Sequence, residues 1–218
     1  MEFPLDPLLT PIEARVLGAL MEKQLTTPDA YPLTLNSLLL ACNQKTSREP
    51  VSHYESGEVQ RCINELQERK LVEVDWGARA ARYDQRLTRV VSLDKAAQAL
   101  LCVMMLRGPQ TLSELLTRTQ RMFDFGSTQA IEEKLQHLCV KTHPAFMHIP
   151  RLAGQREDRY MHLLSGAPDL EALAAQTHNR SERNDDGRTQ LEERVTLLEN
   201  QLAELQAQVA RLLEKSAE

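Results

Sequence analysis

The chain has 218 residues, only 8 of them glycine, and a formal net charge of −5. This length exceeds one minimal domain and suits two small domains with an additional element, and the scarcity of glycine favours helix. The N-terminus has no basic stretch followed by an apolar one, and no apolar run reaches the roughly 20 residues of a membrane span, so we expect a cytoplasmic protein without a signal peptide or membrane helix.

Three helices are predicted at the start of the chain. The first begins after Thr10, which can cap it, with Pro11 at the first helical position and Glu13 completing a capping box. The second begins near Thr34, and the third begins near Ser56 as its N-cap. Apolar residues at helical spacing give the third helix a buried face, made of Val59, Ile63 and Leu66.

Two strands are predicted to follow. Residues 72–76 alternate apolar and acidic side chains, which is typical of a half-buried strand ending at Trp76. Residues 77–80 are a turn. A second alternation carries the chain through Tyr83 and Gln85 to Leu87, so the sequence predicts a hairpin after the three helices.

The same order of elements occurs a second time. The same number of residues separates Thr34 from Thr111 and Tyr83 from Tyr160. Asp94 can cap the first helix of this second copy, Thr111 and Glu114 can form a capping box, and Ser127 can open the third helix. Strands are predicted at residues 146–149 and 159–164, and the matched apolar positions are Ile131, Leu135 and Leu138.

Three helices followed by a two-stranded hairpin are typical of the winged helix-turn-helix unit. We therefore expect a mainly α, α+β fold with two tandem winged-helix domains, residues 8–92 and 93–168. The order repeated at matched core positions favours this interpretation over two unrelated small domains.

A polar hinge and a coiled coil are predicted at the end of the chain. Residues 169–189 are interpreted as a short helix and a hinge, followed at residues 190–215 by a heptad pattern that favours a parallel two-stranded coiled coil and hence a homodimer. The alternative is a lone amphipathic helix folded back on the domains. The candidate dimerisation residues are Leu191, Val195, Leu198, Leu202, Leu205, Val209 and Leu212.

Several separate segments resemble one known family. They are LTPIEARVLG at residues 9–18, TPDAYPL at 27–33, ACNQKTSREP at 41–50 and LRGPQT at 106–111. Together they are similar to the YceH family of bacterial proteins over about residues 8–165. The resemblance implies tandem winged-helix domains and a cytoplasmic location, and it implies little about activity.

The sequence gives no motif for catalysis, for a cofactor or for a metal. No nucleophile elbow or phosphate-binding glycine loop is present, and the four cysteines form no CxxC pair. The densest group of metal-ligating types is His137, Cys139, His143 and His148, whose spacing we interpret as packing rather than a zinc site. We therefore expect a protein that is not an enzyme and holds no cofactor.

Candidate nucleic-acid contacts come from the wing, from the loop before the third helix and from that helix itself. Basic and amide side chains there can donate to phosphate or to base edges. The solvent face of the third helix is acidic, however, which argues against ordinary major-groove docking. The candidates are Lys45, Arg48, Arg61, Asn64, Arg79, Arg82 and Arg86.

Two functional classes remain open from the sequence. The first is a dimeric DNA-binding regulator that contacts the duplex through its wings and loops. The second is a protein-interaction scaffold that uses its winged helices without binding DNA. The acidic excess lies in residues 169–218 and leaves the rest of the chain close to neutral, so charge alone does not choose between them.

Overall fold

The computed structural model describes residues 5–76, 80–151 and 155–171. Residues 1–168 form one compact unit and residues 169–218 a second. The hinge after residue 171, the predicted coiled-coil positions and Arg79 lie outside the described residues. Within the first unit, we call residues 8–92 the first module and residues 93–168 the second module.

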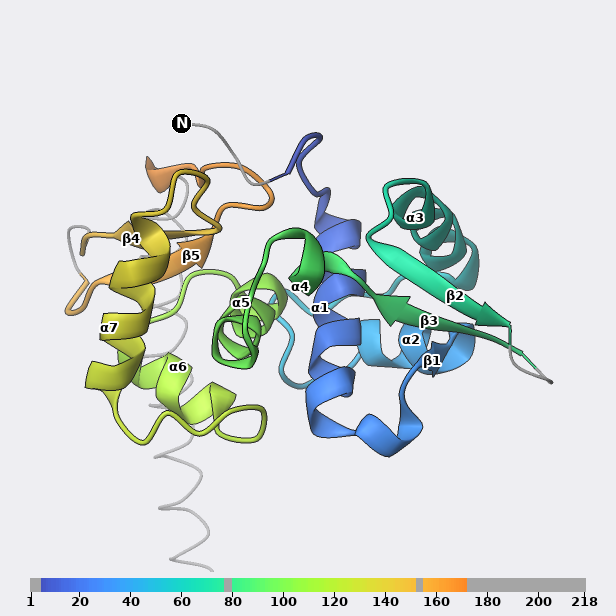
Figure 1. Ribbon diagram of the computed structural model, residues 1–218, viewed down its shortest axis with the longest axis horizontal. Helices are drawn as coiled ribbons and strands as arrows, with labels where there is room; N and C mark the ends of the chain where they lie inside the picture. The colour runs from blue at the N-terminus through green and yellow to red at the C-terminus, as the bar shows by residue number, and fades with distance from the viewer. Residues whose placement is uncertain (1–4, 77–79, 152–154, 172–218) are drawn as a thin grey trace, which may run out of the picture. The chain divides into compact units, whose positions relative to one another are not determined.

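The first module is an α+β unit with a small sheet (Figure 1). Its helices are α1 (Pro11–Thr26), a 3-10 turn (Pro28–Ala30), α2 (Leu35–Cys42), α3 (Ser56–Glu68) and the short α4 (Leu87–Val90). Its strands are β1 (Leu33–Thr34), β2 (Val72–Trp76) and β3 (Ala81–Gln85). The strands pair antiparallel in the order β1-β3-β2, with Val74 opposite Tyr83.

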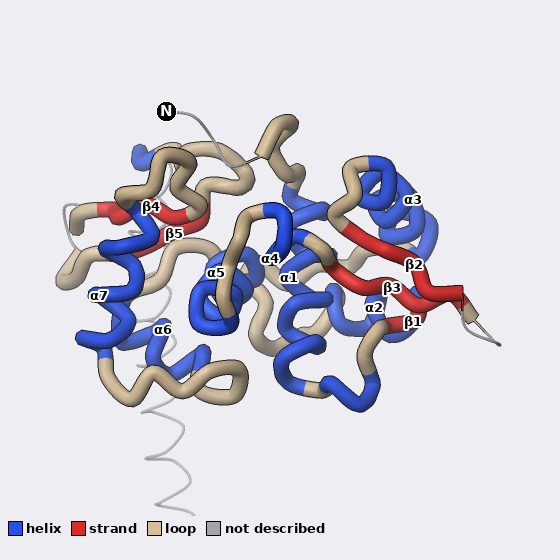
Figure 2. The backbone as a smooth tube through the Cα atoms, in the orientation of Figure 1, coloured by secondary structure: helices blue, strands red, loops and turns tan. Residues whose placement is uncertain are grey.

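The second module repeats the order of three helices followed by a hairpin. Its helices are α5 (Lys95–Arg107), α6 (Leu112–Thr119) and α7 (Thr128–Cys139), and its hairpin is β4 (Phe146–Ile149) with β5 (Arg159–His162) (Figure 2). An isolated bridge joins Gln110 to Tyr160, where the first module pairs Leu33 with Tyr83. The two modules therefore share the pairing that ties the segment before the second helix to the hairpin.

The helix starts follow the predicted capping residues with one exception. Thr10 and Thr111 form the predicted capping boxes, and Asp94 and Ser127 accept the predicted backbone bonds. The prediction of Ser56 as a cap is wrong by one residue. Glu55 is the N-cap of α3, because its backbone N–H donates to the Glu58 carboxylate at 2.7 Å and its own side chain accepts in return.

The predicted strand through Leu87 is also wrong at its end. The pairing of β3 with β2 stops at Gln85, and Leu87 begins α4, where its side chain is fully buried. The predicted strand of the second module is also too long, because β5 ends at His162 rather than at Leu164. A buried leucine at an alternating position fits a strand and a helical turn equally well, so the pattern could not separate them.

Helices α1 and α5 lie side by side at the centre of the unit (Figure 1). Each contains a continuous run of buried residues, from Glu13 to Met21 in α1 and from Ala97 to Leu106 in α5. Gly18 allows the close approach, because a Cβ there would lie 3.0 Å from Leu106 Cδ2. The Cys102 thiol donates to the Gly18 carbonyl oxygen at 3.4 Å. The two modules therefore share one hydrophobic core.

Within the described ranges, no helix combines the length and the apolar character that crossing a membrane requires.

The second module buries a histidine that titrates outside its ordinary range. His162 is 4% exposed, and its Nδ1 has no hydrogen-bond partner among the residues that the structure describes. Burial lowers the pKa of His162 to about 4. The matched residue of the first module is Gln85, whose amide bonds Gln24 at 2.8 Å and Thr88 at 3.1 Å. Protonating His162 therefore favours the unfolded chain.

We expect His162 to make the unit sensitive to acid. The unfolded chain takes up this proton near the ordinary histidine value of about 6.5, and the folded chain takes it up only near pH 4, so the stability falls as the pH drops through this window. The shift corresponds to roughly 3 kcal/mol between pH 7 and pH 4. Urea unfolding at several pH values measures the loss, and His162→Gln, which copies the first module, should remove it. An equal loss in that variant would contradict the assignment.

Candidate binding surface

The first module places α3 beside a hairpin that extends past the core. Strand β2 leaves the end of α3 and runs back along it, and the Tyr83 hydroxyl on β3 donates to Gln60 Oε1 on α3 at 3.3 Å (Figure 1). Val59, Cys62, Ile63 and Leu66 bury the inner side of α3. Its outer side and the end of the hairpin are therefore held together as one exposed surface. We call this surface, comprising the solvent side of residues 55–68 and the hairpin residues 75, 76, 81 and 82, the α3–wing face.

Trp76 is the most exposed large hydrophobic residue of this surface. It ends β2 opposite Ala81, on the side of the hairpin that carries Val72, Val74 and Tyr83. Its side chain is 82% exposed, because the hairpin at this point extends beyond the helices that cover its first residues. The prediction of a half-buried strand was correct in placing Trp76 on β2, but wrong in placing its side chain on a buried face. Its position as the last residue before the turn was the only signal in the sequence.

The outer side of α3 carries an excess of carboxylates. The exposed acidic residues there are Glu55, Glu58, Glu65 and Glu68. Between residues 55 and 68, Arg61 is the single basic residue. Glu55 and Glu58 cap the helix and still face solvent. Asn64 is also exposed, and its side-chain oxygen accepts from Gln60 at 2.9 Å. The predicted contacts Arg61 and Asn64 are thus accessible, but in an acidic setting.

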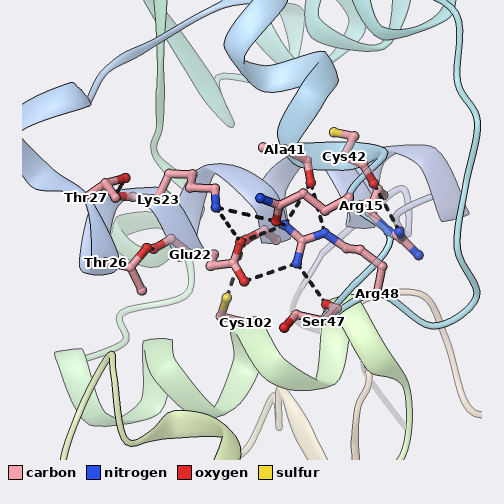
Figure 3. A network of polar contacts seen from close by, with 12 residues as sticks. Arg15, Glu22, Lys23, Thr26, Thr27, Ala41, Cys42, Ser47, Arg48 and Cys102 are labelled. Atoms are coloured by element: carbon pink, nitrogen blue, oxygen red, sulfur yellow. Dashed lines mark hydrogen bonds and ion pairs between the residues drawn. The ribbon is translucent and has the colours of Figure 1, made fainter.

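The loop between α2 and α3 holds Lys45 and Arg48 in opposite environments. Lys45 is exposed, whereas Arg48 is 5% exposed and points into the unit. The Arg48 guanidinium donates to Glu22 at 2.6 and 3.1 Å, to the Ala41 carbonyl at 2.8 and 3.0 Å, and to Gln44 (Figure 3). The donors of Arg48 are therefore used inside the protein, and Arg48 is not part of the exposed surface.

A second buried arginine anchors the same loop. Arg15 on α1 donates to the Cys42 carbonyl at 3.3 Å, to the Pro50 carbonyl at 2.7 Å and to the Ser52 hydroxyl at 3.2 Å (Figure 3 shows Arg15 beside Cys42). Burial lowers the pKa of Arg15. Glu22 balances the charge of Arg48: burial acts to raise the pKa of Glu22, but the Arg48 hydrogen bonds and charge outweigh it and lower the pKa.

The hairpin arginines differ in how far they are neutralised. Arg86 pairs with Glu73, and its Nη1 lies 3.0 Å from Asp84 Oδ2, so two carboxylates surround it. The hydrogen bond that Arg86 donates to the Glu73 carboxylate raises the pKa of Arg86. Arg82 is exposed and donates to the Pro32 carbonyl at 2.8 Å. Of the predicted nucleic-acid residues described, Lys45, Arg61 and Arg82 present charge to solvent without an acidic partner.

The histidine and cysteine cluster of the second module is dispersed. His148 Nε2 lies 2.8 Å from Asp158 Oδ2 on the hairpin, while His137 belongs to α7. Among the described residues, no three His, Cys, Asp or Glu side chains are placed to hold a metal ion. Burial raises the pKa of Cys42 and Cys62 to about 12 and that of Cys139 to about 11, and it raises the pKa of Cys102 further. These thiols therefore stay protonated near neutral pH.

Comparisons with known proteins give one consistent family. The family model described as a protein of unknown function, DUF480, matches residues 9–155. A UPF0502 protein of Ectopseudomonas mendocina is 48% identical over 188 residues, covering 84% of this chain and 86% of the relative. A UPF0502 protein of Mesorhizobium japonicum is 45% identical over 206 residues, covering 94% of this chain and 97% of the relative.

Proposed function

For this chain, which belongs to the DUF480 family of proteins of unknown function and is thereby confirmed as YceH-like, we propose a non-catalytic role in binding another protein. The two modules would act as winged-helix units, and the α3–wing face of the first would dock a basic protein segment. The element order of three helices and a hairpin supports the winged-helix interpretation, as does the β1-β3-β2 strand order.

The observation that carries this proposal is the charge of α3 beside an exposed tryptophan. A winged helix that reads DNA brings its third helix against phosphates, where four exposed carboxylates against Arg61 are unfavourable. The same carboxylates favour a partner rich in lysine and arginine. The Trp76 ring adds a face over which a partner's cation can bind, and exposed tryptophan is enriched at the energetic centres of protein interfaces.

Some of the basic residues that the sequence predicts as DNA contacts are occupied by partners within the protein. Arg48 uses its donors inside the unit, and Arg86 is paired with Glu73 and Asp84. Among the candidates that the structure describes, Lys45, Arg61 and Arg82 remain for phosphate contact. Duplex DNA is therefore the second candidate ligand, and the experiment below separates the two.

Trp76 is the single tryptophan of the chain, so intrinsic fluorescence reports on the α3–wing face directly. We expect an arginine-rich peptide to change Trp76 emission, with an affinity that falls as salt rises. Glu65→Lys together with Glu68→Lys should weaken this binding at least tenfold, because both carboxylates are exposed and neither caps α3. Glu157→Lys with Glu171→Lys makes the same charge change at exposed positions of the second half and should leave it unchanged.

Duplex DNA is titrated in parallel. If the duplex binds and the peptide does not, and if Arg79→Ala, Arg82→Ala and Arg86→Ala together weaken binding evenly across sequences and flatten its salt dependence, the nucleic-acid interpretation replaces this proposal. Peptide binding that the Glu65 and Glu68 substitutions leave unchanged would also contradict it.

We further propose that the chain is a homodimer joined by the heptad pattern of residues 190–215. Sedimentation equilibrium should give a dimer for the full chain and a folded monomer after deletion of residues 190–218. Leu198→Glu with Leu205→Glu should give the same monomer at full length, while Asn200→Glu, outside the heptad seam, should not. A full-length monomer at tens of micromolar protein would exclude assembly by this seam.

A further inference from the structure

The second module contains a cavity that the proposed function does not use. It lies between the start of α5 and α7 and has a volume of about 180 Å³. Leu93, Ala97 and Leu138 give it an apolar floor, and polar side chains form the rest of its lining. Those polar residues are Ser92, Asp94, Lys134, His137 and Lys141.

The charges around this cavity leave a positive excess. Lys134 Nζ lies 2.5 Å from Asp94 Oδ2, so these two residues neutralise each other. The other oxygen of Asp94 caps α5 by accepting from the Ala97 N–H at 2.9 Å. In the part of the chain that the structure describes, the side chains of Lys141 and His137 make no hydrogen bond or ion pair. Lys141 therefore presents an ammonium that donates to no carboxylate of the described residues, beside an apolar floor.

In the first module, an ion pair occupies the position that corresponds to this cavity. Arg69, at the end of α3, pairs with the Glu13 carboxylate at 2.6 Å and also donates to the Pro7 carbonyl. Glu13 is the third residue of α1 and is 3% exposed. A buried carboxylate from the first turn of the module's first helix thus meets a cation from the end of its third helix.

The second module has a cation, Lys141, at the position of Arg69, but no carboxylate at the position of Glu13. Asp94 caps α5 as Thr10 caps α1, so Ala97 occupies the position of Glu13. The spacing that matches Leu66 to Leu138 also matches Arg69 to Lys141. Alanine keeps the Cβ of glutamate but lacks the Cγ methylene group and the carboxylate, and Ala97 lines the cavity of the second module.

We propose that this cavity binds a small carboxylate ligand, whose carboxylate pairs with Lys141 and whose short aliphatic body lies on Leu93, Ala97 and Leu138. The ligand takes the place that Glu13 occupies beside Arg69 in the first module. A lysine beside an apolar floor suits one carboxylate on a short chain, since the ammonium supplies the charge and the floor excludes water from the methylene groups.

Several other charges bear on the same space. The pKa of Asp94 is lowered, because the hydrogen bonds from Lys134 and the Ala97 amide, together with the charges of Lys134 and Lys141, outweigh the effect of burial, which alone would raise it. Asp94 therefore stays ionised and keeps Lys134 engaged. This leaves Lys141 as the ammonium that an incoming carboxylate meets, with His137 as a further donor on the same side of α7.

Butyrate is the probe of choice, because it reproduces a glutamate side chain together with its Cα. Amide resonances of the full-length protein should shift on titration with butyrate at the residues around the cavity, with a dissociation constant in the millimolar range for so small a ligand. Butyramide has the same shape without the charge and should give at least tenfold weaker shifts. Inorganic phosphate, which carries charge without the aliphatic body, should also bind at least tenfold more weakly.

Two variants test the site from opposite directions. Lys141→Gln should weaken butyrate binding at least tenfold, and the residue is exposed, so the fold is retained. Ala97→Glu supplies the carboxylate found in the first module and should raise the melting temperature, fill the cavity and abolish butyrate binding. Lys70→Gln removes an exposed lysine elsewhere and should bind butyrate like the wild type.

Equal shifts with butyrate and butyramide would overturn the proposal, as would wild-type binding in Lys141→Gln. Stronger binding of phosphate than of butyrate would also overturn it, because the aliphatic floor would then have no part in recognition. None of these measurements involves the α3–wing face, so their outcome is independent of the proposed protein-binding role.

Discussion

Replacing Arg48 by methionine is expected to destabilise the protein by about 3–5 kcal/mol. Methionine keeps much of the length of the side chain and removes the guanidinium. The Glu22 carboxylate, whose side chain is 14% exposed, then loses its buried partner, and the Ala41 carbonyl loses two donors. Removing one member of a buried ion pair is costly because the other stays charged in a poorly solvated place. Urea unfolding measures the loss.

A second substitution distinguishes this mechanism from a general effect of mutating the loop. Adding Glu22→Gln to Arg48→Met removes the stranded charge and should restore a large part of the stability, which a double-mutant cycle quantifies. Lys45→Met alters an exposed residue of the same loop and should change the stability by no more than about 0.5 kcal/mol. If Arg48→Met unfolds at the same urea concentration as Lys45→Met, Arg48 has no structural role and returns to the surface candidates.

The Glu22–Arg48 pair also gives a direction for pH. Because the pKa of Glu22 is lowered in the folded state, its contribution to stability is present above its unfolded pKa and is lost as the pH falls through the folded value. This loss adds to that expected from His162. Comparing Glu22→Gln with His162→Gln across the acid range separates the two contributions.

Truncating Leu135 or Ile63 to alanine is expected to cost about 2–5 kcal/mol each. Both side chains are fully buried at matched positions, Leu135 in α7 and Ile63 in α3. Because α1 packs on α5 and residues 1–168 form one compact unit, either truncation should lower a single cooperative transition. Urea unfolding followed by circular dichroism gives both the cost and the number of transitions.

Neighbouring exposed residues provide the controls. Gln136→Ala follows Leu135 in α7, Asn64→Ala follows Ile63 in α3, and both should stay within about 0.5 kcal/mol of the wild type. An unchanged unfolding profile for Leu135→Ala would show that this position does not belong to the core. Two separate transitions, with each truncation lowering only one, would show that the modules unfold independently.

Helix positions and core residues were predictable because their signals are local. A capping box such as Thr10 with Glu13 involves residues three apart, and an apolar face such as that of α3 repeats within one element. The errors occurred where a local pattern has two solutions. Leu87 is buried as the predicted strand residue would be, but it is buried by a helical turn.

The candidate binding residues were less predictable because their environment depends on distant partners. Arg48 and Lys45 lie in the same polar loop, and the sequence predicts the same role for both. Glu22, which pairs with Arg48, is on α1, and nothing in the loop indicates this pairing. Trp76 is the opposite case, a residue predicted to be buried that is exposed. Strand alternation places its side chain on the apolar side of the hairpin, but the hairpin extends beyond the helices at this point and leaves the side chain exposed.

The sequence by itself determined the order of the elements, their capping residues, the matched core positions of the two modules and the family. Each of these depends on residues close in the chain or on patterns that repeat along it. Only the tertiary structure decided which charges face solvent, that α1 and α5 share one core around Gly18, and that Ala97 leaves a cavity beside Lys141. These features depend on pairs of residues far apart in the chain, whose approach is fixed by packing and not by either local sequence.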